Sequence, residues 1–295
     1  MRNTLTCAAF GLVIASLAPL GHAHAVAGNR IFPATLAVDD PGIGDELDFQ
    51  FGHIRAPNDD GDAVTVNTLS ANYAKTITPS LAFSVGSNYT TQRVSDNSAV
   101  KGFDNLGLGI KYVVYVNPVH EFMLSVGMNG DIGGSGSKAI GSSYSTYAPT
   151  VYAGKGFGDL PDALNWLRPF AITGTVGQQY ASDSAVPNTL DWGMTLQYSL
   201  PYLQSFVKNV GLPKPLANLI PVVELAMSTC TSGSCSGSTT GTINPGIIWQ
   251  SRTVQVGLEA QIPANSASGH TIGMRLQTHF FFDDIFPKTI GKPIF

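Results

Sequence analysis

The strongest constraint on this chain is a pair of alternating segments near its C-terminus, residues 253–263 and 271–281. Apolar residues occupy the even positions of both segments, apart from Thr278, and most odd positions are polar or glycine. A period of two with one apolar face is the pattern of a β-strand. The segments therefore predict an antiparallel strand pair, whose apolar face fits either a packed core or a lipid-facing wall.

Repetition of this pattern favours the wall. Polar, Gly/Ser-rich loops alternate with short turns or connectors between the segments, and both chain ends fall on the connector side, as in bacterial outer-membrane barrels. The sequence predicts an all-β fold, a transmembrane antiparallel up-and-down β-barrel of about 12 strands. The predicted strands are 46–54, 64–75, 81–92, 106–116, 121–129, 147–155, 168–180, 190–200, 220–227, 242–250, 253–263 and 271–281.

Three prolines fit this pattern poorly. Pro149, Pro221 and Pro245 fall within or at the ends of predicted strands. A closed barrel has no free edge at which a missing backbone donor is harmless. These positions therefore indicate strand starts, bulges or misplaced boundaries.

Composition agrees with a membrane wall made of strands. Only 12% of the residues are charged, against about 25% in an ordinary soluble protein. The net charge of −4 and the lack of a basic run argue against nucleic acid as a partner. Beyond the leader, no stretch approaches the roughly 20 apolar residues of a membrane helix.

The N-terminus indicates export. Arg2 is followed by an apolar run from Leu5 to Leu20 and by Ala23-His24-Ala25, which together resemble a secretory signal peptide cleaved near Ala25. We therefore expect a leader at 1–25 and one barrel domain at 26–295 in the bacterial outer membrane. Within that domain, 26–45 is expected to be a periplasmic lead-in and 283–295 a C-terminal tail.

The mature chain keeps two cysteines, Cys230 and Cys235, within a Ser/Gly-rich loop. A close pair in an exported protein predicts a disulfide. Metal binding would need further ligands, and no histidine lies near either cysteine in sequence. We expect neither a metal nor a cofactor.

The inward faces of the predicted strands carry mixed charge. Such a lining is compatible with a slender aqueous pore, and equally with ion pairs that close the lumen. The predicted lumen-lining residues are Glu46, Asp48, Lys111, Glu121, Asp191, Glu224, Glu259, Arg275 and His279.

Catalysis finds little support in the sequence. His279 lies near Thr278 and Ser251, as a lipid hydrolase on the outer wall would require, but its parity places it in the lumen. No Gly-x-Ser-x-Gly motif is present, so we expect no enzyme and assign no catalytic residue. The pairs Asp39-Asp40 and Asp283-Asp284 lie outside the predicted strands and suit solvated turns or helix caps.

The two end segments resemble a known family. Arg30-Ile-Phe-Pro-Ala-Thr-Leu-Ala-Val-Asp-Asp-Pro41 and Phe282-Asp-Asp-Ile-Phe-Pro-Lys-Thr-Ile-Gly-Lys-Pro-Ile-Phe295 are similar to segments of proteobacterial outer-membrane barrels of the MetA-pathway of phenol degradation family. The resemblance implies a channel for organic compounds and brings no catalytic residues. Phe295 resembles the terminal aromatic recognised by the barrel-assembly machinery. The interruption at Lys292-Pro293 leaves a second choice, in which the strand at 274–282 is the assembly signal.

The sequence as a whole predicts a passive outer-membrane channel for small molecules, with aromatic or hydrophobic ones among the candidates. Its expected partners are outer-membrane lipid, the barrel-assembly machinery and a small-molecule solute. The alternative is a structural or adhesive barrel with a closed lumen, and an outer-membrane lipid hydrolase is a weaker one.

Overall fold

The computed structural model describes residues 25–57, 63–94 and 98–295. The predicted leader lies outside them, apart from Ala25. Twelve long strands form the wall, and a short strand, β6 (Val100–Phe103), pairs only with β5. The wall strands are β3 (Glu46–Pro57), β4 (Ala63–Thr78), β5 (Leu81–Val94), β7 (Leu106–Asn117), β8 (Phe122–Ile132), β9 (Thr146–Gly156), β10 (Phe170–Ala181), β11 (Thr189–Tyr198), β12 (Leu219–Cys230), β13 (Thr239–Gln250), β14 (Val254–Pro263) and β15 (Gly273–Phe281).

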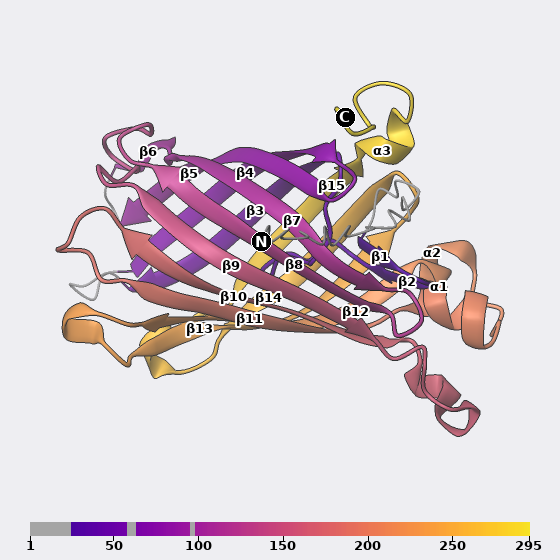
Figure 1. The fold of residues 1–295 in the computed structure, drawn as a ribbon. Helices are drawn as coiled ribbons and strands as arrows, with labels where there is room; N and C mark the ends of the chain where they lie inside the picture. The colour runs from indigo at the N-terminus through magenta and orange to yellow at the C-terminus, as the bar shows by residue number, and fades with distance from the viewer. Residues whose placement is uncertain (1–24, 58–62, 95–97) are drawn as a thin grey trace, which may run out of the picture.

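The wall closes into an up-and-down barrel (Figure 1). Each wall strand pairs antiparallel with the next, and β15 returns to pair with β3, with His279 opposite Asp48 and Leu276 opposite Phe51. Every predicted strand is present, with boundaries that differ by a few residues. The predicted twelve-stranded antiparallel barrel is confirmed.

The two faces of the wall differ as the alternation predicts. Leu106, Leu108, Ile110 and Tyr112 of β7 all expose their side chains on the outside. Among the described residues, buried polar side chains outnumber buried apolar ones. The barrel therefore has an apolar outer face and a polar interior, the reverse of a soluble domain.

The three prolines are accommodated within the ladders. Pro149 pairs with Met128 on β8, but the pairing of β9 with β10 skips its position. Pro245 likewise pairs with Val223 on β12 and is skipped on the β14 side. Pro221 pairs only toward β13, because the β11 ladder stops at Val222. Each proline thus turns its missing donor toward one neighbour, where the ladder is locally interrupted.

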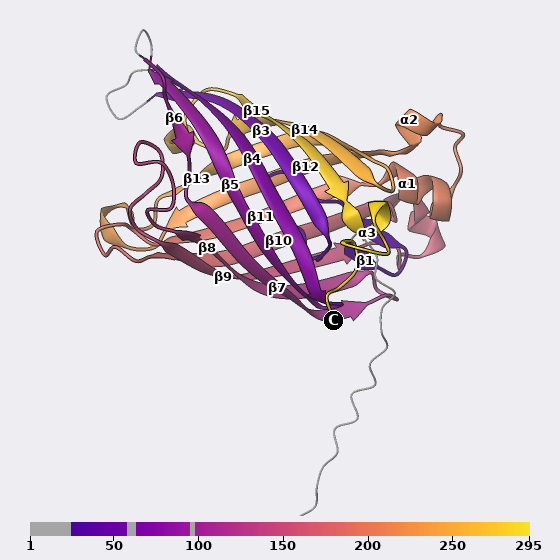
Figure 2. The same cartoon turned by 90° about the horizontal axis from the view of Figure 1, so that it is seen from above.

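Helical segments gather at one end of the barrel, here called the connector end (Figures 1 and 2). They are η1 (Asp162–Leu167), α1 (Leu200–Tyr202), η2 (Leu203–Val207), α2 (Lys214–Ala217) and α3 (Phe282–Ile285). The opposite, loop end carries η3 (Gly233–Cys235) and η4 (Ser266–Ser268). No helix in the described part of the chain is long and apolar enough to cross a membrane.

Residues 25–45, here called the plug, lie inside the connector end (Figure 1). Strands β1 (Ala25–Ala27) and β2 (Arg30–Phe32) form a hairpin through Gly28, whose φ is 65°. An added Cβ on Gly28 would lie 2.2 Å from the Pro118 carbonyl oxygen, so the turn requires glycine. This segment forms no wall strand and lies within the lumen, where Glu224, Lys111 and Arg275 contact it.

The C-terminal tail lies against the connector end of β4. The backbone N–H of Ile294 donates to the Thr76 carbonyl at 3.2 Å, and that of Phe295 to the Ile77 carbonyl at 2.9 Å. The Phe295 side chain is 86% exposed, while the last wall strand ends at Phe281. The terminal aromatic therefore lies outside the barrel wall.

Candidate functional site: the plugged lumen

Glu224 and Arg275 hold the plug near the middle of its length. The Glu224 carboxylate, fully buried on β12, accepts hydrogen bonds from the backbone N–H groups of Leu36 at 2.8 Å, Ala37 at 2.9 Å and Val38 at 2.7 Å. Arg275 on β15 donates to the Leu36 carbonyl at 2.5 Å and lies 3.8 Å from the Glu259 carboxylate. Two oppositely charged wall residues thus bind the N–H and C=O groups around one plug residue, in charge-assisted bonds.

Two glutamines make further hydrogen bonds to the plug backbone. Gln255 donates to the Ala34 carbonyl at 2.5 Å and to the Gln277 side-chain oxygen at 2.8 Å. Gln277 in turn donates to the Thr35 carbonyl at 3.4 Å. The plug backbone from residue 34 to 38 is therefore bound through its peptide groups by side chains of β12, β14 and β15.

Glycines in the wall form recesses for the apolar side chains of the plug. An added Cβ on Gly193 would lie 2.6 Å from Val38 Cγ2, and one on Gly257 would lie 2.6 Å from Leu36 Cδ1. Gly154 is similarly close to Phe32 and Pro41. Because glycine in a strand interior weakens the strand, its use here marks a close approach of another segment.

The start of the plug is anchored by a buried cluster at the connector end. The Arg30 guanidinium donates to Glu121 at 3.1 Å and to the Pro169 carbonyl at 3.0 Å, and it lies 3.9 Å from the centre of the Tyr202 ring. The Tyr202 hydroxyl donates to Glu121 at 2.8 Å. Burial, and the bond to the Glu121 carboxylate, raise the pKa of Tyr202 to about 12. Burial lowers the pKa of Arg30, against the attraction of Glu121.

The far end of the plug is bound by β7 and β8. Lys111 forms an ion pair with Asp39 at 2.7 Å and donates to the Asp40 carbonyl at 2.9 Å. Ser125 donates to the Pro41 carbonyl at 2.5 Å. Asp40 accepts from the Gly42 N–H at 2.7 Å, as in a turn. Loss of hydration raises the pKa of Asp40 to about 7, even though Lys111 opposes the shift.

The remaining predicted lumen residues lie elsewhere on the inner wall. His279 lies between Glu46 at 3.1 Å and Asp48 at 3.2 Å, so both ring nitrogens contact carboxylates and neither contacts a hydroxyl. Asp191 accepts from the Ser228 hydroxyl at 2.6 Å. Within the described residues, Glu121, Lys111, Glu224 and Arg275 make hydrogen bonds to the plug, whereas the hydrogen bonds of His279 and Asp191 go to other wall residues.

A row of polar side chains crosses the wall at the height of Glu224. Thr173, Thr195, Glu224 and Asn244 are direct register partners across β10 to β13, and all are buried. The hydroxyls of Thr173 and Thr195 and the amide of Asn244 have no hydrogen-bond partner within the described residues. Buried polar groups are normally hydrogen-bonded, so these groups need water or another polar partner in the lumen.

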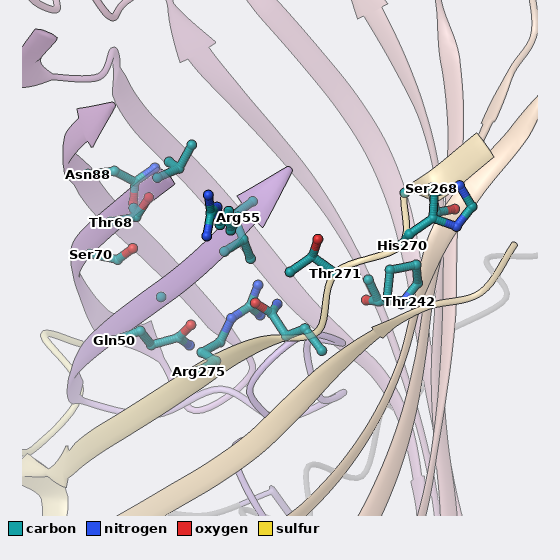
Figure 3. Close-up of a pocket in the computed structure, with 16 residues that line it drawn as sticks. Gln50, Arg55, Thr68, Ser70, Asn88, Thr242, Ser268, His270, Thr271 and Arg275 are labelled. Carbon is teal, nitrogen blue, oxygen red and sulfur yellow. The ribbon is translucent and has the colours of Figure 1, made fainter. Parts of the chain in front are cut away.

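The loop end of the lumen is open and polar (Figure 3). A cavity of about 390 Å³ lies between Gln50, Thr68 and Ser70 on one side and Thr271 and Arg275 on the other. A second, of about 320 Å³, shares Ser70 and Asn88 with it. A third, of about 300 Å³, is lined by Ala37 and Val38 of the plug and by Gly193 of the wall. The first cavity reaches Arg275, which binds the plug, and the third reaches Val38 of the plug itself.

Sequence reasoning missed the plug side of these contacts. Arg30, Asp39 and the peptide groups of 34–38 follow no period of two, and their partners lie far along the chain. The inward glycines of β11 and β14 were the available signal. Cys230 and Cys235 form a disulfide in the loop between β12 and β13. No group of three or more metal-ligating side chains is found in the described ranges.

Comparison with known proteins defines the fold class. No protein-family model matches the chain, and no curated protein matches its sequence. An outer-membrane channel from Pseudomonas putida F1 has a similar fold, with 12% identity, a TM-score of 0.52, and coverage of 85% of this chain and 99% of that chain. The translocator domain of the autotransporter NalP from Neisseria meningitidis shares 12% identity over 82% of this chain and 90% of that chain, with a TM-score of 0.49. The NanC porin shares 9% identity over 79% and 98%, with a TM-score of 0.48. The chain has the fold of an outer-membrane β-barrel.

Proposed function

We propose that the protein forms a passive outer-membrane channel for small molecules, and that the plug closes it when seated. The polar row beneath the plug supports this proposal. In a permanently filled barrel, the polar atoms of Thr173, Thr195 and Asn244 that lack partners would destabilise the fold, because each loses its hydration without a compensating hydrogen bond. A lumen that opens to water hydrates these atoms whenever the plug leaves.

Opening then requires release of residues 34–41 from the middle of the wall. Their contacts with Glu224, Arg275 and Lys111 run mainly through plug backbone groups, which water can replace. Once the plug leaves, Glu224, Glu259 and Arg275 line the part of the lumen that it occupied. Lumen lining by all nine predicted residues is part of this proposal.

The solute class is proposed from sequence resemblance. The segments Arg30–Pro41 and Phe282–Phe295 resemble those of the MetA-pathway of phenol degradation family, and this supports small aromatic or hydrophobic molecules as solutes. The first of these segments contains most of the plug. On this proposal, that resemblance concerns the part of the chain that controls passage.

A closed structural or adhesive barrel is the second candidate. The buried Arg30–Glu121–Tyr202 cluster favours it, because a firmly anchored plug closes the lumen permanently. Catalysis is not part of either proposal: both ring nitrogens of His279 contact carboxylates.

Membrane insertion completes the proposal. We propose that a leader ending near Ala25 directs export, that outer-membrane lipid contacts the apolar outer face, and that the barrel-assembly machinery recognises β15. Phe295 is the weaker candidate signal, because it lies outside the wall.

Conductance in planar bilayers tests the channel directly. Refolded protein, verified as a barrel by its heat-dependent gel mobility, should give discrete openings. Arg275 lines the loop-end cavity, so Arg275→Glu should shift the ion selectivity of those openings toward cations. Verified barrels that give no openings, in the native protein and in Arg275→Glu, would refute the channel and favour the closed barrel.

A further inference from the structure

Two connectors at the connector end expose an unusual combination of side chains. Trp166 of η1 and Phe206 of η2 are each 50% exposed, although both are large and apolar. Leu164, Leu167, Val210 and Leu216 of the same connectors are exposed as well. These connectors join β9 to β10 and β11 to β12, and they project beyond the end of the barrel wall (Figure 1).

The longer connector is also positively charged. From residue 192 to 223 the chain contains Lys208 and Lys214 and no acidic residue. Within the described ranges, neither lysine forms an ion pair. Lys208 lies over the Trp166 ring, 5.8 Å from its centre, which joins the two connectors into one surface.

This surface continues the lipid-facing wall. Tyr198 and Phe170 are cross-strand partners at the ends of β11 and β10, with ring centres 4.7 Å apart. The Tyr198 hydroxyl donates to the Trp166 carbonyl at 3.3 Å. The apolar outer face of β11, which includes exposed Met194 and Leu196, therefore leads directly to Trp166 and Lys208.

We propose that this surface binds the phosphate headgroups of anionic phospholipids in the leaflet at the connector end. The aromatic and aliphatic side chains enter the boundary between headgroups and acyl chains, as Trp and Tyr do in membrane proteins. Lys208 and Lys214 lie at headgroup depth and attract anionic lipid. The inference is independent of channel activity and requires only that the barrel spans a membrane.

Lipid-specific quenching of Trp166 provides the test. Trp192→Phe and Trp249→Phe leave Trp166 as the single tryptophan. The protein is reconstituted in phosphatidylcholine that contains a small, equal fraction of either brominated phosphatidylglycerol or brominated phosphatidylcholine. The anionic lipid should be enriched around Trp166 by about fivefold, the factor for one basic residue near an anionic surface. Raising the salt to 1 M, where the Debye length is about 3 Å, should reduce this preference.

Paired lysine variants separate this site from general charge attraction. Lys208→Gln with Lys214→Gln should abolish the preference, while the barrel remains folded by gel mobility. Lys101→Gln with Lys138→Gln removes two positive charges at the loop end and should leave it intact. Equal quenching by the two lipids, or equal loss in the two double variants, would overturn the proposal. A folded protein with the lipid preference but no conductance would leave it standing and refute only the channel.

Discussion

The two halves of the lumen are built differently, although the same twelve strands line both. At the loop end, Ser, Thr, Asn and Gln side chains face cavities of about 390 and 320 Å³. At the connector end, the wall has recesses at Gly154, Gly193 and Gly257 that the plug fills. The wall alone therefore does not determine the free width of the lumen. The plug, which belongs to no wall strand, reduces that width at the connector end.

Equivalent substitutions in the two halves of the lumen should therefore have different consequences. Changes where the plug is bound should alter how often the lumen is open. Changes at the loop end should alter which ions or solutes pass, or should have little effect.

Loss of the Glu224 carboxylate should have the largest effect. Glu224→Ala removes three charge-assisted bonds to the plug, and we expect the seated state to lose about 3–5 kcal/mol. Because about 1.4 kcal/mol is a factor of ten, open probability in single-channel records should rise by two orders of magnitude or more, up to saturation.

Asp191→Asn is the matched control for Glu224→Ala. It also removes an inward carboxylate, but one that bonds to Ser228 and not to the plug. Open probability should stay near that of the native protein. If both variants open equally, the plug contacts of Glu224 do not control the channel.

Filling a plug recess should have an intermediate effect. Gly257→Val places side-chain atoms where Leu36 lies, and such overpacking costs about 1–3 kcal/mol. The plug should be displaced more often, which single-channel recording and proteolysis of the plug would both detect. Gly52→Val, facing the loop-end cavity with its nearest neighbour 4.0 Å from an added Cβ, should leave seating unchanged.

Across any single pH unit, the effect of pH on seating should be smaller, at most about 1.4 kcal/mol. Asp40 has a pKa of about 7 in the seated plug and should have its usual value near 3.9 when the plug is released. Seating is therefore unaffected by this group below pH 4 and weakens as the pH rises from 4 to 7. A single pKa unit corresponds to about 1.4 kcal/mol. Open probability should increase across this range.

Asp40→Asn should flatten that pH profile. The groups around Asp40 are Lys111, Asp39 and Glu46, and all three remain in the variant. Asp283 is a second carboxyl whose pKa is raised, to about 8, by burial and by Asp45. A profile that persists in Asp40→Asn and disappears in Asp283→Asn would assign the effect to the connector end of β3.

The wall was predictable from the sequence, and the plug was not. Period-two alternation predicted all twelve strands, because a strand's two faces meet different solvents, and it assigned Glu224 and Arg275 to the inward face. The plug has no such period. Its contacts join residues as far apart as Leu36 and Arg275, and local sequence does not encode such pairings. Strand-interior glycines such as Gly193 were the only hint that something approaches the wall closely.

Reversible locking of the plug tests the central claim most directly. Val38→Cys with Gly193→Cys joins the plug to the recess that Val38 fills. We predict that the oxidised protein gives no openings and that a reductant restores them. The native protein, which has the Cys230–Cys235 disulfide but no cysteine at Val38 or Gly193, should conduct equally with and without the same reductant. Unchanged conductance in protein whose cross-link has been verified by mass spectrometry would contradict control of passage by the plug.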